Sequence, residues 1–145
     1  TSALDVSVQA SVLRLIRDLG IARGVATLLV SHDLAAVRAL SHRIAVLYRG
    51  ELVEVGQAAE VCTAPMHPYT KALLAAVLEP EAGGHHRIRL APDRGDIQNP
   101  ACAFAPRCPD CREICVATKP EWRGTEHRAR CHLADAQLPR SRLSV

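Results

Sequence analysis

Aromatic residues and long apolar runs are what this sequence most clearly lacks. Only 3% of its 145 residues are aromatic although 48% are hydrophobic, so we expect a core built from Leu, Val, Ile and Ala. No apolar run approaches the roughly 20 residues that a membrane-spanning helix needs. A secretory signal is not expected either, because the chain opens on an amphipathic helical pattern rather than on a basic flank and an apolar core. Direct insertion into a membrane is therefore not predicted.

Runs of positive charge are also missing. The formal net charge is +3, and no five or six Lys or Arg residues follow one another. Proteins that bind nucleic acid through a basic patch usually concentrate their positive charge, so we expect no nucleic-acid partner. A nucleic-acid-binding zinc module is disfavoured for the same reason.

Cysteine, in contrast, is concentrated in one part of the chain. Cys62 stands alone, and five further cysteines fall within thirty residues: Cys102, Cys108, Cys111, Cys115 and Cys131. Without a secretory signal, such clustering more often indicates a metal site than a disulfide framework.

Hydrophobic periodicity predicts an α/β arrangement in the first part of the chain. Apolar residues three and four apart predict a helix over residues 6–19, which Gly20 would end. The continuous apolar run Val25 to Val30 predicts a strand buried on both faces, as in a parallel sheet. A short helix is expected over residues 34–40, directly after Ser31-His32-Asp33.

The middle of the chain predicts a hairpin followed by helices. Residues 43–48 and 51–55 read as two strands joined by a tight turn at Arg49-Gly50. Residues 58–62 suit one or two helical turns, and a longer helix should start at Pro68, a residue tolerated at the first helical position. Composition then shifts to Gly, His, Pro and charged residues through about residue 100, which predicts a linker.

Two motifs in the first part of the chain resemble one known family. Ser2-Ala3-Leu4-Asp5 precedes a helix, Ser31-His32-Asp33 follows the predicted strand, and 27 positions separate Asp5 from His32. Together with RIAVLYRGELVEVG from residue 43, they resemble the C-terminal half of the P-loop (RecA-like) ATPase domain of ABC transporters. Taken singly, His32 would also suit a hydrogen-bonded loop position and Asp5 a helix N-cap.

The resemblance implies specific roles for these residues. His32 would be the switch histidine, which hydrogen-bonds the γ-phosphate of ATP bound with Mg²⁺. Ser2 and Asp5 would lie in the D-loop, at the interface with a second ATPase subunit, and would help to place the attacking water. Such a site acts by positioning and electrostatics, because phosphoryl transfer gathers charge on the γ-phosphate oxygens. A homo- or heterodimer is implied.

Other parts of that machinery are not in the sequence. It has no G-x-x-x-x-G-K-[ST] loop to cradle the phosphates, no LSGGQ segment and no acidic Walker B strand. We therefore expect this chain to be part of a longer subunit and not to hydrolyse ATP alone.

The last third of the chain narrows the resemblance. HPYT at residues 67–70 and PRCP at residues 106–109 resemble the C-terminal extension of the ATPase subunits of oligopeptide, dipeptide and nickel importers. The extension continues as a cysteine and then H-R-x-x-C, which here are Cys115 and residues 127–131.

The extension implies a metal site. The resemblance implies a [4Fe–4S] cluster held by four thiolates, Cys102, Cys108, Cys115 and Cys131. Zinc remains an alternative, because four Cys suit it equally, Cys108-x-x-Cys111 has zinc-ribbon spacing, and His127 and His132 are near. Reduced structural thiols are the third possibility.

The predicted organisation has three parts: an ATPase-core part at residues 1–57, a helical extension and linker at 58–100, and a Cys-rich region at 101–145. The expected protein is part of the energy-coupling subunit of a peptide importer. It would pair with a second ATPase subunit and with membrane permease subunits, at the cytoplasmic face of the membrane. The alternative is a stand-alone metal-binding or regulatory module without ATPase activity.

Overall fold

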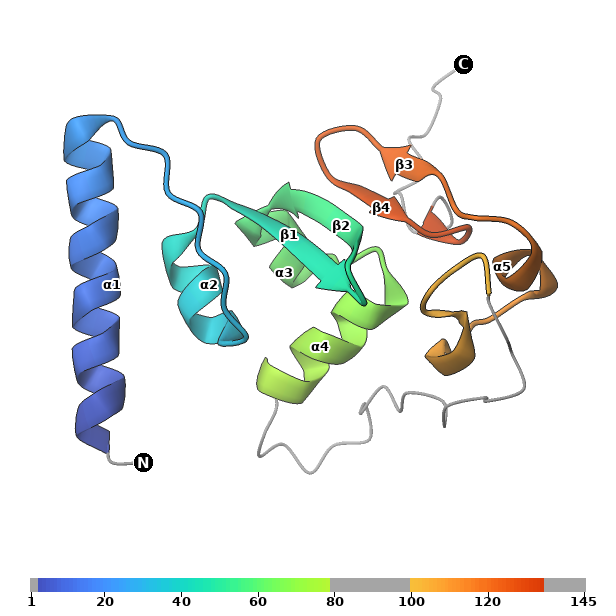
Figure 1. Ribbon diagram of the computed structural model, residues 1–145, viewed down its shortest axis with the longest axis horizontal. Helices are drawn as coiled ribbons and strands as arrows, with labels where there is room; N and C mark the ends of the chain where they lie inside the picture. The colour runs from blue at the N-terminus through green and yellow to red at the C-terminus, as the bar shows by residue number, and fades with distance from the viewer. Residues whose placement is uncertain (1–2, 79–99, 135–145) are drawn as a thin grey trace, which may run out of the picture. The chain divides into compact units, whose positions relative to one another are not determined.

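The computed structural model describes residues 3–78 and 100–134 (Figure 1). Backbone contacts divide the chain into two compact units, Thr1–His42 and Arg43–Val145. No helix within the described ranges combines the length and the apolar character that crossing a membrane requires.

The first unit contains helix α1 (Ala3–Arg23), which runs past the predicted end at Gly20. The helix ends in a Schellman motif, in which the Val25 N–H donates to the Gly20 carbonyl at 2.9 Å and the Gly24 N–H to the Ile21 carbonyl at 3.3 Å. Gly24 has a φ of 65°, so it is the left-handed residue that closes the helix. The prediction chose the wrong glycine, because a single Gly is tolerated inside a helix.

The predicted strand over residues 25–30 is wrong for this structure. The run has no regular secondary structure, and Leu28 and Val30 are 90% and 88% exposed. A strand buried in a parallel sheet needs neighbours for its backbone N–H and C=O groups, and the described residues of this unit include no other strand. Helix α2 (Leu34–Leu40) follows as predicted.

The second unit is built on a four-stranded antiparallel sheet in the order β1-β2-β4-β3. Its strands are β1 (Arg43–Tyr48), β2 (Glu51–Gln57), β3 (Trp122–Gly124) and β4 (Arg128–Arg130). The mixed α/β class is confirmed, but the described sheet is antiparallel rather than parallel.

The β1–β2 hairpin is confirmed together with its turn. Arg49 and Gly50 have φ values of 47° and 82°, so both central residues are left-handed, as a type I′ turn requires. The other two strand pairings, β2–β4 and β3–β4, were not predicted. Strand β4 joins β2 through Glu54↔Ala129 and Val55↔Arg128.

The helices of the second unit are short. They are α3 (Ala58–Thr63), α4 (Pro68–Leu78), the 3₁₀ turn η1 (Ala105–Arg107) and α5 (Glu113–Ala117). Helix α4 begins at Pro68 as predicted, and α3 packs against the β1–β2 hairpin. The 3₁₀ turn and α5 were not predicted, since neither is long enough to show a periodicity.

The core of this unit combines aliphatic residues with most of the scarce aromatic ones. Phe104 is 1% exposed, and its ring centroid lies 5.1 Å from Tyr48 and 5.5 Å from Tyr69. Three of the four aromatic residues therefore meet where β1, α4 and the cysteine segment converge. The expectation of a purely aliphatic core was incomplete.

Candidate functional site

The predicted ATP-site residues lie in the first unit. Ser2 is outside the described residues, and Asp5 is described only as a backbone position in the first turns of α1. The roles predicted for both residues therefore stay predictions.

His32 is exposed in the loop that enters α2, and its neighbours organise that loop. The Asp33 N–H donates to Ser31 Oγ at 3.0 Å, and Asp33 Oδ1 accepts from the Ala36 N–H at 3.1 Å. Asp33 is thus the N-cap of α2, a role that sequence reasoning did not assign although Asp directly before a helix signals it. The cap fixes the backbone on one side of His32 and leaves the imidazole exposed to solvent.

The four predicted ligand cysteines lie in the second unit, and none of them forms a disulfide. The Cys102 N–H donates to the Cys115 carbonyl at 2.9 Å, and η1 connects Cys102 to Cys108. Cys131 follows directly after β4. Three short elements, η1, α5 and β4, therefore position these thiols in one part of the unit.

Burial is the main influence on these thiols. The pKa of Cys108 is raised to about 12, mainly by loss of hydration and additionally by the charges of the nearby Asp110, Cys131 and Cys115. Burial likewise raises the pKa of Cys102 and of Cys131, and in both cases the charge of Cys115 adds to the rise. Cys115 thus lies within electrostatic range of each of the other three thiols.

Backbone N–H groups oppose this rise at three of the four sulfurs. The Leu133 N–H donates to Cys131 Sγ at 3.4 Å. The amides of Phe104 and Ala105 lower the pKa of Cys102, and the amide of Asp110 lowers that of Cys108. Such donors favour the thiolate, which is the form that binds metals.

The described residues do not form a completed ligand set. Within residues 3–78 and 100–134, no three His, Cys, Asp or Glu side chains are grouped as a metal ion would require. The histidines considered for zinc have other partners, since His132 Nε2 lies 2.9 Å from the Thr118 carbonyl and His127 Nε2 lies 2.7 Å from Glu54 Oε1. The chemistry of the four thiols suits a thiolate-bound metal, and a closed coordination geometry is not formed.

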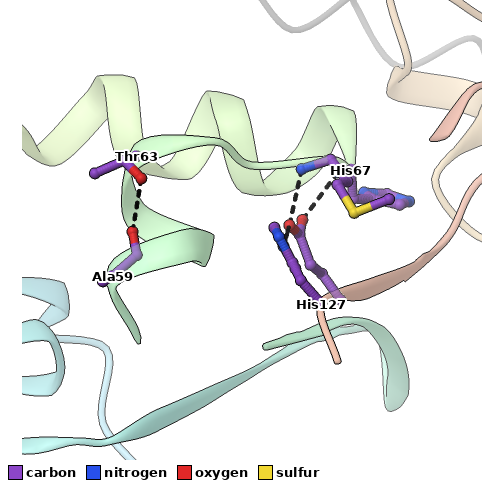
Figure 2. Close-up of polar contacts among 6 residues, drawn as sticks. Ala59, Thr63, His67 and His127 are labelled. Carbon is purple, nitrogen blue, oxygen red and sulfur yellow. Dashed lines mark hydrogen bonds and ion pairs between the residues drawn. The ribbon is translucent and has the colours of Figure 1, made fainter. Parts of the chain in front are cut away.

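A buried carboxylate lies beside the thiol region. Glu54 is 0% exposed, and its Oε1 accepts from the Met66 N–H at 2.8 Å while its Oε2 accepts from the His67 N–H at 2.9 Å. His127 contacts the same Oε1 (Figure 2). Because the two amides directly precede α4, Glu54 provides negative charge at the start of that helix.

Sequence reasoning missed Glu54. The alternating polarity of residues 51–55 indicated a strand but did not single out Glu54, and an acidic residue is seldom fully buried unless it is paired. Its partner His127 lies 73 residues away, so no local pattern could reveal the contact.

His67 is the second buried polar residue of this region and is 1% exposed. Its Nδ1 accepts from the Tyr69 N–H at 3.1 Å, and its ring lies 5.6 Å from that of Phe104. Burial, and then the charge of Lys71, lower the pKa of His67 to about 4. The side chain is therefore neutral at physiological pH and acts as a structural acceptor.

Comparison with known proteins places this region in a family. Residues 53–115 match the family model described as "Oligopeptide/dipeptide transporter, C-terminal region". This stretch belongs to that transporter family. The transporter-family region, residues 53–115, includes Glu54, His67 and three of the four predicted ligand cysteines.

Named relatives match more of the chain. A peptide import ATP-binding protein of Brucella abortus (strain 2308) is 41% identical over 134 residues, which is 91% of this chain and 40% of the relative. One from Brucella ovis is 41% identical over 127 residues, which is 84% of this chain and 39% of the relative. The chain thus spans about two fifths of the length of the curated relatives it matches.

Proposed function

We propose that this chain is the C-terminal part of the ATP-binding, energy-coupling subunit of an ABC importer for oligopeptides or dipeptides. The observation that carries the proposal is the match of residues 53–115 to the transporter family, extended by 41% identity over 134 residues to a protein named for peptide import and ATP binding. A stand-alone metal-binding or regulatory module is not favoured, because that similarity also covers the first unit.

In this proposal the first unit contributes to an ATP site that is shared with a second ATPase subunit. His32 hydrogen-bonds the γ-phosphate, and Ser2 and Asp5 lie at the subunit interface. The exposure of His32 and the Asp33 cap beside it support this role, because an imidazole on an anchored loop can reach a ligand without losing buried contacts. The assembly includes ATP with Mg²⁺ and permease subunits, at the cytoplasmic face of the membrane.

A chimera tests the ATPase role. This chain would replace the matching part of the Brucella abortus relative, and ATP hydrolysis and peptide uptake would be measured in proteoliposomes. We expect the chimera to be active and His32→Ala to lower hydrolysis by about a hundredfold, the usual cost of removing one donor to a transition-state oxyanion. His42→Ala, which alters another exposed histidine of the same unit, is the matched control.

Two results would contradict the ATPase role. One is full hydrolysis by the His32→Ala chimera. The other is ATP turnover by the 145-residue chain alone, which has no phosphate-binding loop.

We further propose that Cys102, Cys108, Cys115 and Cys131 bind a [4Fe–4S] cluster, with Zn²⁺ as the alternative. The electrostatic influence of Cys115 on the other three thiols and the N–H groups that lower the pKa of three of the thiols support a thiolate site. When bound, the metal would cross-link η1, α5 and the end of β4, so its role is structural.

Metal analysis after anaerobic purification tests this site. We expect iron and sulfide in equal amounts, and their loss in Cys102→Ser but not in Cys62→Ser, whose thiol lies on α3. Stoichiometric zinc without iron would favour the alternative. A chain that contains no metal and whose stability is unchanged would indicate that the four cysteines are reduced structural thiols.

A further inference from the structure

The β3–β4 hairpin is attached to the transporter-family region by little backbone pairing. Only Glu54↔Ala129 and Val55↔Arg128 join β4 to β2. Two ion pairs also link the hairpin segment to the other strands, Lys119–Glu51 at 2.7 Å and Arg43–Glu126 at 3.7 Å, but their side chains are 37% to 79% exposed. Because exposed ion pairs stabilise little, the attachment must depend on buried contacts.

One buried contact between these parts is the polar contact between Glu54 and His127. The 2.7 Å separation joins a completely buried carboxylate to a side chain that is 14% exposed. The other two bonds of that carboxylate go to backbone amides of its own region. His127 is therefore the partner through which Glu54 reaches the hairpin, and it directly precedes β4.

Gly56 provides the space for this contact. A Cβ at position 56 would lie 2.7 Å from Cδ2 and 3.0 Å from Cγ of His127, which is closer than carbon atoms pack. The imidazole thus lies directly on the backbone of β2, where only glycine fits.

The same carboxylate is connected to Cys131 through Met66. The Met66 amide donates to Glu54, and Met66 is 5% exposed in a cluster with Ala129, Cys131 and Ala134. Cys131 is 9% exposed and lies four residues after His127. Glu54 thus contacts both His127, which directly precedes β4, and Met66, which packs against Cys131.

We propose that Glu54 and His127 form a latch that docks the β3–β4 hairpin on β2 and thereby positions Cys131 beside the other three thiols. Glu54 and His127 are positioning residues that touch no ligand. The docking needs no metal, whereas a ligand role for Cys131 rests on the function proposed above.

Thiol alkylation of the metal-free chain tests the latch. The chain would be treated with a chelator and a reductant, pulsed with N-ethylmaleimide at neutral pH, and analysed by mass spectrometry for the rate at each cysteine. We expect His127→Ala to raise the rate at Cys131 by about tenfold or more, since removing one partner of a buried charged hydrogen bond favours local opening to this extent. Glu54→Gln should raise the rate as well, because its NH₂ group cannot accept from a backbone N–H as a carboxylate oxygen does. The rate at Cys62 should stay constant, because α3 packs against the β1–β2 hairpin and its position is not set by the β3–β4 hairpin.

Two further variants separate positioning from a general loss of stability. Glu60→Gln removes an exposed carboxylate of α3 and should leave both rates unchanged. His127→Gln keeps an N–H donor and should restore much of the protection that His127→Ala removes. Once Glu54 is Gln, adding His127→Ala should have little further effect, because the two side chains act as one unit.

The latch is refuted if Cys131 stays protected in His127→Ala, or if Cys62 and Cys131 accelerate together in both His127 variants. If Glu54→Gln unfolds the whole unit, the comparison of His127→Ala with His127→Gln decides. A chain that binds no metal yet shows these rates would refute the metal site and support the latch.

Discussion

His67 should make the second unit sensitive to acid. Burial and the neighbouring Lys71 lower its pKa to about 4, whereas an unfolded histidine titrates near 6.5. Between these pH values the unfolded chain binds a proton that the folded chain does not. The stabilising contribution is therefore complete above pH of about 6.5 and is lost as the pH falls towards about 4.

The size of the effect follows from the gap between the two pKa values. One pKa unit corresponds to about 1.4 kcal/mol, so the full loss is roughly 3 kcal/mol, of which roughly 2 kcal/mol should appear between about pH 7 and about pH 4.5. His67→Asn isolates this contribution. Its side-chain oxygen can accept from the amide two residues on, as Nδ1 accepts from Tyr69, but it does not titrate.

Urea unfolding at the two pH values measures the difference. The fluorescence of Trp122, the only tryptophan of the chain, reports on the second unit. The wild-type chain should lose roughly 2 kcal/mol more than His67→Asn on acidification. His42→Asn, which changes an exposed histidine, should behave as wild type. Equal losses in wild type and His67→Asn would mean that His67 is not held neutral by burial.

Three other substitutions test further contacts. Phe104→Ala should destabilise the second unit by about 3–5 kcal/mol in urea unfolding, because the ring is 1% exposed and contacts two tyrosines. Gly56→Ala should expose Cys131 to alkylation as His127→Ala does, because the new Cβ displaces the imidazole. Asp33→Ala should weaken α2 by about 1 kcal/mol and speed hydrogen exchange at the Ala36 amide. A smaller loss in Phe104→Ala, a protected Cys131 in Gly56→Ala, or unchanged exchange in Asp33→Ala would contradict the respective contact.

The parts of the fold that sequence predicted are those encoded locally. The β1–β2 hairpin follows from alternation and from a turn whose residues adopt left-handed angles, both contained in fifteen consecutive residues. Helix α4 follows from Pro68 and an apolar face. Neither prediction needed a distant partner.

The run over residues 25–30 shows the limit of such patterns. Six residues, of which five are apolar and three are β-branched, indicate a strand, but a strand forms only where another strand accepts its hydrogen bonds. The first unit includes no such strand among its described residues, so Leu28 and Val30 are exposed. Apolar composition thus predicts the tendency to pair and not the presence of a partner.

The candidate site, like the fold, could be predicted from the sequence only in part. The type of chemistry at the thiols could be inferred from spacing, because four Cys in a short segment suggest a thiolate site. The contacts that hold them could not be inferred, since three-residue strands give no periodicity and the Glu54–His127 pair is defined only by folding.

The cysteine segment contributes to the same core as the β1–β2 hairpin. Phe104 packs against both Tyr48 and Tyr69, Glu54 contacts His127, and Met66 packs in one cluster with Cys131. A segment so poor in aliphatic residues cannot bury enough surface alone, and here the missing surface comes from β1, β2 and α4. The shared core therefore supplies part of the stability of this segment. A metal at the four thiols would instead add a cross-link between η1, α5 and β4 in a unit whose core is already shared. Because His67 and Phe104 are in contact, such a cross-link would also stabilise the start of α4 within the transporter-family region.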